Sequence, residues 1–528
     1  MQYGKQPISL FPGNFVFNMD HQFLCFPVLF TVFLFILTVL RMRKKSKGKN
    51  SSPNLPPGPW KLPLIGSMHH LVGSLPHQCL RDLAKKYGPL MHLQLGEVTN
   101  IVISSPETAK HVMKTHDVTF AQRPFLLAAS IVAYEFSDIA FAPYGDYWRQ
   151  MRKICTLELL TGKRVKSFRS IREEEMSKLI RSLSSSAGSP INFSKMFSSL
   201  TYSITSRAAF GKIWKGEETF KSAVKKLIQL AGGFTLADVY PSIKLLHVIS
   251  TTRPKLERLR QIIDEIFDNI IYEHKARKAA AKSGTDSEEQ DFVDVLLNFQ
   301  DGADLEFPLT NDNIKGVILD TFIAGSETSS TTVEWAMSEM LKNPRVMEKA
   351  QAEVRMVFGI EGNIDEERLH ELHYLKMVIK ETLRLHPPIA LLLPRECREN
   401  CVINGYDIPV KSKVTVNAWA IGRDPDYWIE AERFYPERFL NSSIDYKGNN
   451  FELIPFGAGR RMCPGILFGM ANVESPLARL LYYFDWKLPA GLKPENLDML
   501  EVFGAAVKRK NELQLIPIPY FPPPPPVE

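Results

Sequence analysis

The sequence predicts a mainly α-helical protein with small β-sheets, preceded by one N-terminal transmembrane helix. Three stretches lead to this fold class. Residues 23–40 form an apolar run, residues 310–343 form a long segment without proline, and residues 89–105 alternate as in a hairpin. The chain of 528 residues is 45% hydrophobic, which is sufficient for one large core.

The N-terminal apolar run is followed by an abrupt basic stop. As a helix, residues 23–40 would span about 27 Å, which suits the thin bilayer of the endoplasmic reticulum. Residues 41–49 contain six positive charges and no negative ones, so the positive-inside rule places the rest of the chain in the cytosol. A cleaved signal peptide carries its charge before the apolar run, where only Lys5 lies. We therefore expect a single-pass protein of the endoplasmic reticulum membrane.

Composition sets the other boundaries. We expect an N-terminal extension at 1–20, the anchor at 21–40, a basic and proline-rich linker at 41–63, one large domain at 64–520 and a proline-rich tail at 521–528. Met19 is the expected start of translation, because Met-Asp-His-Gln leads directly into the apolar run. Five prolines between residues 53 and 63 prevent a helix and favour a semi-rigid spacer.

Net charge and cysteine usage exclude two classes of protein. The chain has 65 Lys and Arg and 58 Asp and Glu, so without the six basic residues of the linker it has 59 against 58. This balance argues against a nucleic-acid-binding surface. Six scattered cysteines are too few for a disulfide framework, so the large domain suits a reducing compartment.

The large domain is expected to be mostly helical, with the hairpin near its start. Trp148 and Arg152 are four residues apart and would share one face of a helix. The polar residues 275–290 are expected to form a mobile surface connection. Thr310 suits the N-cap of the long helix that ends before Pro344, with Asp312 in its first turn.

A glycine-rich turn near the C-terminus indicates the chemistry. It reads Phe456-Gly-Ala-Gly-Arg-Arg461-Met-Cys463-Pro-Gly. Glycines allow close approach to a bulky partner, and Arg461 is expected to favour the thiolate of Cys463. A lone cysteine is usually a small buried hydrophobe, but these surroundings are typical of a metal ligand. No nearby Cys or His completes a tetrahedral zinc site, whereas one axial thiolate suits haem iron.

The pattern Phe-x-x-Gly-x-Arg-x-Cys-x-Gly resembles the haem-binding signature of the cytochrome P450 family. The surrounding residues are similar to plant microsomal members that oxidise terpenoids. The resemblance implies the P450 fold, heme b with Cys463 as its axial iron ligand, and monooxygenase chemistry with dioxygen. Three further motifs stand in the family's order: Trp148-x-x-x-Arg152, Ala324-Gly325-x-Glu327-Thr328, and Glu381-x-x-Arg384 upstream of Arg438.

The resemblance also implies roles for these residues. Ala324 and Gly325 would admit dioxygen, and Glu327 and Thr328 would relay protons. The expected haem contacts are Cys463, Trp148, Arg152, Arg395, Arg461 and Phe456. Glu381, Arg384 and Arg438 would form a buried network that fixes the segment presenting the cysteine. Without the resemblance, Trp148 and Arg152 could equally belong to a surface helix, and a second Glu-x-x-Arg at Glu257 and Arg260 reads as a solvated pair.

The sequence has no recognisable nucleotide site of its own. Gly457-Ala-Gly459 fails the dinucleotide pattern at Met462, and the phosphate-loop and His-Glu-x-x-His patterns do not occur. Electrons are therefore expected from a partner, NADPH–cytochrome P450 reductase. We expect Arg149, Lys153 and Arg460 to help dock it.

Four apolar segments resemble the substrate-recognition regions of the family: 120–128, 318–323, 389–393 and 502–506. The candidate substrate contacts are Ile323, Ile389, Leu391, Leu392 and Phe503, each of which could equally be a core residue. An apolar pocket favours a sesquiterpene or diterpene, and the alternatives are a flavonoid, an alkaloid or a fatty acid. Two other classes are a reductase-independent hydroperoxide isomerase, which the intact Glu327-Thr328 argues against, and a non-catalytic haem sensor or electron carrier.

Overall fold

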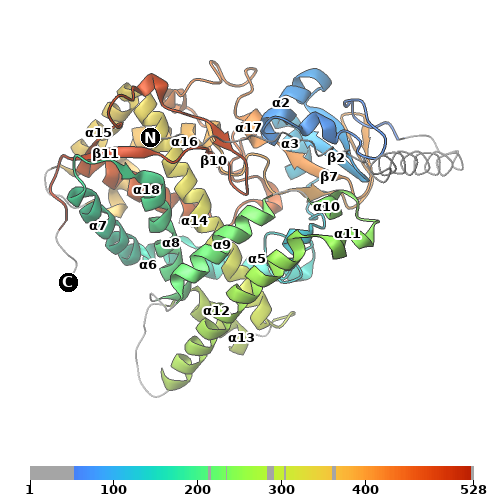
Figure 1. Cartoon of the computed structure of the whole chain (residues 1–528), viewed down its shortest axis with the longest axis horizontal. Helices are drawn as coiled ribbons and strands as arrows, with labels where there is room; N and C mark the ends of the chain where they lie inside the picture. The colour runs from blue at the N-terminus through green and yellow to red at the C-terminus, as the bar shows by residue number, and fades with distance from the viewer. Residues whose placement is uncertain are drawn as a thin grey trace, which may run out of the picture. The chain divides into compact units, whose positions relative to one another are not determined.

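A helix of 32 residues, α14 (Asn311–Lys342), runs through the middle of the fold (Figure 1). Its start and end agree with the sequence prediction. The Thr310 hydroxyl accepts the N–H of Asn313 at 3.2 Å, and the Asn313 side chain accepts the N–H of Thr310 at 2.8 Å. This reciprocal cap satisfies donors that a helix leaves open, and Pro344 begins the next helix because it cannot continue this one.

The structure, a computed structural model, describes residues 53–211, 216–232, 235–281, 290–302, 305–359 and 364–524. Residues 54–528 are one compact unit. Its helices are α2 (Pro76–Tyr87), α3 (Pro106–Lys110), α4 (Leu127–Val132), α5 (Asp146–Ile154), α6 (Gly162–Ser167), α7 (Arg169–Ser185), α8 (Phe193–Phe210), α9 (Glu217–Ala231), α10 (Leu236–Val239), α11 (Lys244–Ile249), α12 (Thr252–Ala281), α13 (Phe292–Gly302), α14, α15 (Pro344–Phe358), α16 (His373–Leu385), α17 (Ala418–Ile421) and α18 (Ile466–Tyr483).

The strands form four small sheets. They are β1 (Leu90–Leu95), β2 (Val98–Ile103), β3 (Ile191–Asn192), β4 (Arg395–Glu396), β5 (Cys401–Ile403), β6 (Tyr406–Ile408), β7 (Lys413–Val416), β8 (Phe484–Lys487), β9 (Glu501–Val502), β10 (Lys508–Arg509) and β11 (Gln514–Pro519). The largest sheet has the order β1-β2-β7-β4, with β2 and β7 parallel and the other pairs antiparallel. The predicted hairpin is its β1–β2 pair, in which Leu90 lies opposite Ile103.

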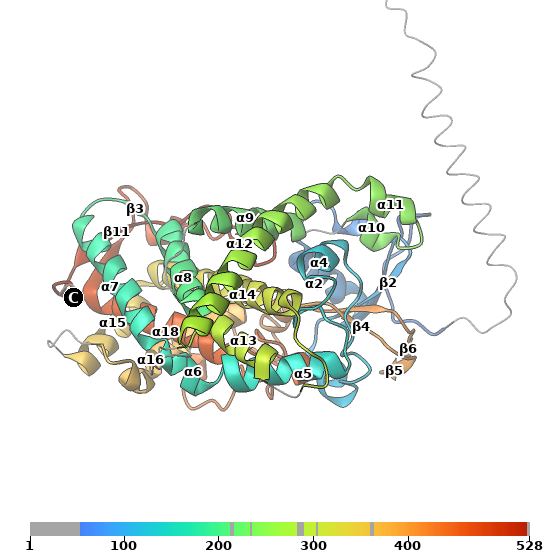
Figure 2. The same cartoon turned by 90° about the horizontal axis from the view of Figure 1, so that it is seen from below.

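Two hydrophobic clusters meet along α14. Its first half, with Ile314 and Phe322, packs with α8, α9, α12 and Phe468 at the start of α18. Its second half, with Val333 and Met340, packs with α15, α16 and the later part of α18. The helices α14 and α18 therefore run side by side in the same direction, which brings the residues before α18, including Cys463, to the middle of α14. Figure 2 shows α14 covered by α8, α12 and α13.

The structure bears on several predictions for the chain outside this core. The surface connection expected at 275–290 is wrong for its first part, because α12 continues through Ala281, where alanines and long side chains favour the helix. Residues 54–63 of the expected linker lie against the sheet, where the N–H of His92 donates to the Pro57 carbonyl at 2.8 Å. The extension at 1–20, the anchor at 21–40 and the linker up to residue 52 lie outside the described residues.

The structure describes no helix with the length and apolar character needed to cross a bilayer.

Candidate active site

The turn around Cys463 is closed by backbone geometry that needs glycine. The N–H of Cys463 donates to the Phe456 carbonyl at 3.0 Å, and α18 begins three residues after the cysteine. Gly457 and Gly459 both have φ of 69°, in the left-handed region that other residues rarely adopt. At Gly459, a Cβ would also collide with the carbonyl oxygen of Met113. The turn therefore fixes the backbone around Cys463, which is partly exposed.

Arg152, rather than Arg461, provides the positive charge that acts on Cys463. Burial raises the pKa of the Cys463 thiol, while the N–H of Gly465 and the charge of Arg152 lower it. The Arg152 guanidinium donates to the carbonyl of Met462, the residue before the cysteine, at 2.5 Å. The expectation for Arg461 is corrected because its side chain turns away and donates to the Ala121 carbonyl at 2.8 Å and the Ala142 carbonyl at 2.6 Å.

Four arginine side chains gather on this side of the turn: Arg123, Arg152, Arg395 and Arg461. Their charges affect one another, because burial followed by the charge of Arg395 lowers the pKa of Arg461 to about 9. Burial followed by the charges of Arg461 and Arg395 lowers the pKa of Arg123 well below its usual range. Arg395 is 3% exposed and donates to the Ala458 carbonyl at 2.8 Å.

The acidic residues that act on this cluster are Asp117, 3.2 Å from Arg395, and Asp138, near Arg123 and Arg461. Four guanidinium groups against two carboxylates leave an excess of two positive charges. Buried cations need anionic partners, and guanidinium groups pair especially well with carboxylates. Heme b carries two carboxylates, so the donors present here fit this cofactor.

The side chain of Trp148 contacts a backbone carbonyl and the guanidinium of Arg461. It is 3% exposed, and its indole N–H donates to the Ile139 carbonyl at 3.0 Å. The guanidinium carbon of Arg461 lies 4.2 Å from the centre of its ring, a cation–π contact. Trp148 and Arg152 lie on α5 as expected, but here the aromatic ring supports Arg461 while Arg152 supports the cysteine turn. Their shared contact with a haem carboxylate stays a prediction.

On α14, the expected oxygen-activation residues face in different directions. Ala324 is exposed and Thr328 is partly exposed, and the Thr328 hydroxyl donates to the Ala324 carbonyl at 2.6 Å. Glu327 is 6% exposed. It accepts a hydrogen bond from the Tyr202 hydroxyl of α8 and forms an ion pair with Lys508 of β10. Successive helical residues point about 100° apart, so the acid and the alcohol do not touch.

Gly325 serves packing in this structure. A Cβ at this position would lie 3.0 Å from the Phe468 ring of α18 and 3.4 Å from the methyl carbon of Thr205 on α8. The space beside Gly325 is therefore occupied by neighbouring side chains, while the free side of the helix is at Ala324. The predicted role of Gly325 in admitting dioxygen stays a prediction, and its contacts indicate a role in helix packing.

Glu381, Arg384 and Arg438 lie together, as the family resemblance implies. Arg384 donates to both carboxylate oxygens of Glu381 at 2.7 and 2.8 Å, and Arg438 donates to one of them at 2.9 Å. Arg384 also donates to the carbonyls of Gly422 and Ala431. The network thus ties α16 to the irregular chain before the cysteine turn.

The five candidate substrate residues are all partly exposed, but they pack against different clusters. Ile323 packs on the α8–α12–α14 cluster and Leu391 on the cluster beneath β1 and β2. Leu392 lies beside the cysteine turn, 3.9 Å from the Cβ position of Gly457. The Phe503 ring stacks on His77, 5.9 Å between centres. Ile389 precedes the buried Ala390. Their shared role in binding a substrate stays a prediction.

Three residues around the site have no signal in the sequence reasoning. Arg123 stands inside the segment 120–128, which was predicted only as apolar, and its neighbours in the fold come from residues 140, 393 and 394. Tyr202 and Lys508 reach Glu327 from 125 and 181 residues away. They could have been expected only from the general rule that a buried carboxylate needs charged or hydrogen-bonding partners.

The sequence profile of the cytochrome P450 family matches residues 56–516 of this chain. The chain belongs to the cytochrome P450 family. The expected fold, mainly helical with small sheets, is confirmed by its similarity to a solved zebrafish cytochrome P450 structure with abiraterone. The TM-score is 0.72 with 25% identity, over 84% of this chain and 99% of that chain.

Curated plant P450 enzymes are much more similar. Desmethyl-deoxy-podophyllotoxin synthase of Sinopodophyllum hexandrum is 59% identical, over 94% of this chain and 97% of that enzyme. Premnaspirodiene oxygenase of Hyoscyamus muticus is 55% identical, over 94% and 98%. The 5-epiaristolochene 1,3-dihydroxylase of Nicotiana tabacum is 54% identical, over the same shares. The predicted resemblance to plant terpenoid oxidases is thereby confirmed, as is the class of enzyme: a haem-thiolate P450 monooxygenase in which Cys463 is the family's axial ligand.

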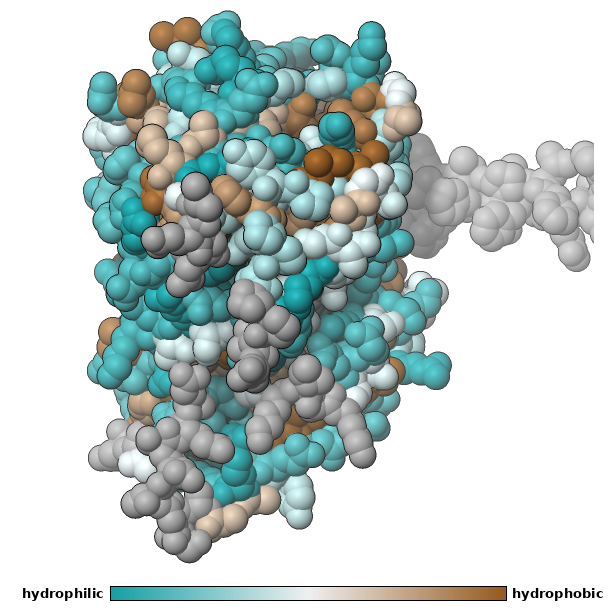
Figure 3. Space-filling view, turned by 90° about the vertical axis from the view of Figure 1, so that its left-hand side faces the viewer, coloured by the Kyte–Doolittle hydropathy of each residue, from teal (hydrophilic) through white to brown (hydrophobic). Residues whose placement is uncertain are grey.

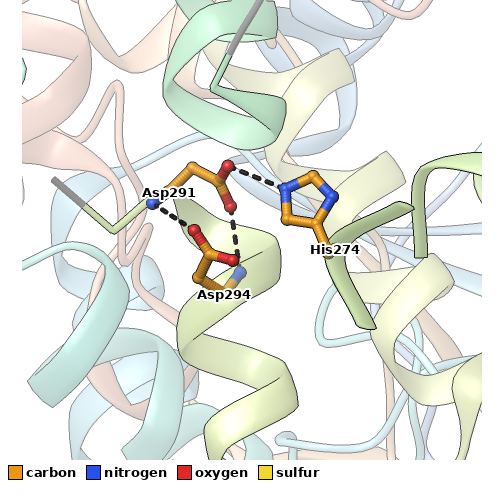
Figure 4. A group of neighbouring side chains, drawn as sticks. All are labelled: His274, Asp291 and Asp294. Carbon is orange, nitrogen blue, oxygen red and sulfur yellow. Dashed lines mark hydrogen bonds and ion pairs between the residues drawn. The ribbon is translucent and has the colours of Figure 1, made fainter. Parts of the chain in front are cut away.

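A second group of side chains, of the types that bind metal ions, lies far from Cys463 in the sequence. His274, Asp291 and Asp294 face one another where α12 approaches α13 (Figure 4). His274 contacts the Ile270 carbonyl through Nδ1 at 2.7 Å and Asp291 through Nε2 at 2.8 Å, while Arg277 holds Asp294 at 2.9 Å. Burial would lower the pKa of His274, but the bond to Asp291 and its charge raise it. These contacts occupy the side-chain atoms that would bind a metal ion, so the group forms a set of charged hydrogen bonds that joins α12 to the start of α13.

Proposed function

We propose that this P450 monooxygenase oxidises an apolar plant metabolite, a sesquiterpene or diterpene. It uses dioxygen and electrons from NADPH–cytochrome P450 reductase. The observation that carries the substrate class is the chemistry of the five candidate contacts, which are partly exposed and all aliphatic or aromatic. Similarity to premnaspirodiene oxygenase and 5-epiaristolochene 1,3-dihydroxylase supports the same class.

The proposed cofactor-binding residues divide the work. Cys463 would ligate the iron, with Phe456 beside it in the turn, and Arg152 would favour the thiolate. Arg123, Arg395 and Arg461 would neutralise the two carboxylates of heme b, with Trp148 supporting Arg461. Bound haem supplies the activation of dioxygen and the oxidation of the substrate's C–H bond.

The residues of α14 would leave room for a small molecule and transfer protons. Ala324 has the smallest side chain that keeps the helix intact, so its exposed face leaves room for a small molecule. Thr328 holds its proton toward the Ala324 carbonyl and would need only a side-chain rotation to donate it elsewhere. Glu327 is held by Tyr202 and Lys508, and a proton relay would require it to leave one of these partners.

We also propose that residues 21–40 anchor the protein in the endoplasmic reticulum membrane. One face of the large domain supports this. Large apolar side chains are exposed in the segment 60–72 and around α10 and α11: Trp60 (60%), Val72 (80%), Leu236 (61%), Leu245 (62%) and Val248 (72%). The Tyr240 hydroxyl donates to the Leu64 carbonyl, which joins the two regions. By contrast, the side of α7, α15 and β11 is mainly hydrophilic, with small separate apolar groups (Figure 3). An apolar face of this kind suits a lipid surface.

The reaction is tested with the purified protein, reductase and NADPH. The carbon-monoxide difference spectrum of the reduced protein should show the thiolate-ligated Soret band, and a Cys463→Ser variant should lack it. A panel of sesquiterpenes, diterpenes, flavonoids, alkaloids and fatty acids should give oxygenated products from the terpenes only. Turnover restricted to another class would reject the substrate proposal. Conversion of hydroperoxides without reductase would favour an isomerase, and a normal spectrum without turnover of any compound would favour a sensor.

A further inference from the structure

Five residues between α4 and α5, segment 138–142, connect two groups of charged side chains. The segment's carbonyls point to the arginine cluster. The Ile139 carbonyl accepts from Trp148 at 3.0 Å, the Ala140 carbonyl from Arg123 at 2.8 Å, and the Ala142 carbonyl from Arg461 at 2.6 Å. These donors are the side chains that we assign to the carboxylates of heme b and to their support.

The N–H groups of the same segment are held by two carboxyl groups. Asp320, on α14, accepts the N–H of Ile139 and of Ala140, each at 3.0 Å. Asp138 accepts the N–H of Phe141 at 3.0 and 3.1 Å and is fully buried. Two acids therefore accept hydrogen bonds from three consecutive N–H groups, while carbonyls of the same segment accept hydrogen bonds from Arg123, Trp148 and Arg461.

Because Asp320 accepts the N–H of Ala140 and Asp138 accepts the N–H of Phe141, the two carboxyl groups lie at neighbouring positions of the segment. Two ionised carboxylates placed in this way would repel each other, and burial adds to the cost of their charges. A proton on one of them removes this repulsion and allows a hydrogen bond between the two acids. Burial raises the pKa of Asp138 to about 6, against the bonds from Phe141 and Ala142. Burial and then the charge of Asp138 raise the pKa of Asp320 well above its usual range.

We infer that Asp138 and Asp320 share one proton and form a carboxyl pair that positions Arg123 and Arg461 through segment 138–142. Both acids are positioning residues, since they act on the cofactor site only through the backbone. The inference rests on the proposed role of the arginine cluster in holding heme b. It explains why two acids that are buried next to an excess of positive charge hold backbone N–H groups.

The pair has a definite response to pH. The charged or titratable groups that act on it are Arg123, Arg461, Tyr147 and Cys155. Because the pKa values of both acids are raised in the folded state, the stability that the shared proton provides is complete below the ordinary value of 3.8. It is lost as the pH rises through the raised values. The segment should therefore loosen toward alkaline pH.

The variants Asp320→Asn and Asp320→Leu separate this inference from a simple packing role. Asparagine imitates the protonated acid: its oxygen can accept both N–H groups, and its amide can donate to Asp138. Leucine removes the acceptors and leaves two N–H groups buried without partners. Asp312→Asn, in the exposed first turn of the same helix, is the matched control.

Two measurements on the holoenzyme are needed: the rate of haem transfer to excess apomyoglobin, and hydrogen exchange of the peptide covering residues 138–142. Asp320→Leu should accelerate haem transfer by roughly ten-fold or more, the effect of losing hydrogen bonds to a charged group, and deprotect the segment. Asp320→Asn and the control should stay within about two-fold of the parent. Faster exchange in Asp320→Leu without faster haem transfer would overturn the inference, as would an Asn variant as damaged as the Leu variant.

The pH profile decides the matter if Asp320→Leu does not fold. From about pH 6 to about pH 9, haem transfer from the parent protein should accelerate more steeply than transfer from Asp320→Asn, which has no shared proton to lose. Equal slopes would overturn the inference. An Arg461→Gln variant that keeps the parent rate would refute the arginine role itself, whereas a fast Arg461→Gln beside an unchanged Asp320→Leu would refute only the carboxyl pair.

Discussion

At the scale of single residues, the environment of Glu327 is the most informative feature of the site. A carboxylate that is 6% exposed in a helix interior requires partners, and Tyr202 and Lys508 provide them from two other elements. Lys508 belongs to the β9–β10 hairpin, which contains the predicted substrate segment 502–506. The hairpin thus connects a substrate-recognition region to the acid proposed for proton transfer.

Replacing Lys508 with methionine should lower the rate of turnover by roughly ten-fold, because the buried Glu327 carboxylate would lose the cation that pairs with it. The measurement is NADPH-dependent product formation at a fixed pH. Lys510→Met, on the exposed side of the same hairpin, should leave the rate unchanged. A Lys508→Met rate that matches the parent would show that this ion pair does not act on the reacting acid.

At the scale of elements, the contact between α16 and the chain before the cysteine turn depends on one acid. Glu381 is 0% exposed and binds both Arg384 and Arg438. Glu381→Gln should lower the free energy of unfolding by about 3–5 kcal/mol, because it leaves buried guanidinium groups without a counter-charge. It should also reduce haem retention. Urea unfolding and the ratio of haem to protein measure the two effects.

Another Glu-x-x-Arg in the chain, at Glu257 and Arg260, provides the control for this prediction. Glu257 is half-exposed and pairs with Arg253 at 2.8 Å, while Arg260 lies over the Tyr134 ring. Glu257→Gln should cost less than about 1 kcal/mol, as exposed pairs do. Similar losses in both variants would mean that the Glu381 network contributes no more than a surface pair.

Sequence reasoning succeeded where the interaction is local or where the pattern is long. The cap at Thr310, the β1–β2 hairpin and the cysteine turn depend on neighbouring residues, so their outlines could be predicted. The contacts of Arg461 could not, because they depend on carbonyls of residues 121 and 142. The same holds for Asp138 and Asp320, which have no periodicity or motif and meet only through the fold.

At the scale of the whole molecule, we propose two surfaces that contact partners. The first is the proposed membrane face around α10, α11 and residues 60–72. Replacing Leu245 and Val248 with aspartate should weaken the binding of a protein lacking residues 1–49 to phospholipid vesicles by roughly ten-fold or more, since two exposed apolar side chains lose their burial in lipid. Vesicle co-sedimentation measures this. The matched control is Met356→Asp, which is 78% exposed on α15, and binding that falls equally in both variants would contradict the assignment.

The second surface is the predicted reductase-docking site. Lys153 is exposed on α5, Arg149 pairs there with Asp146, and Arg460 is 53% exposed beside Asp117. Neutralising all three should lower the rate of reductase-dependent reduction and flatten its dependence on salt, because long-range attraction to an acidic partner is lost. Stopped-flow reduction at several ionic strengths gives both quantities. Unchanged rates and an unchanged salt slope would rule out this docking surface.

We propose that Cys463, the arginine cluster and α14 together form the site of a monooxygenase for an apolar terpene. The most direct test is turnover of a sesquiterpene or diterpene with reductase, NADPH and isotopically labelled dioxygen, followed by mass spectrometry of the product. We expect one labelled oxygen atom in each hydroxyl group formed, and no product from Cys463→Ser. An oxygenated product that carries no label, or equal product from Cys463→Ser, would contradict it.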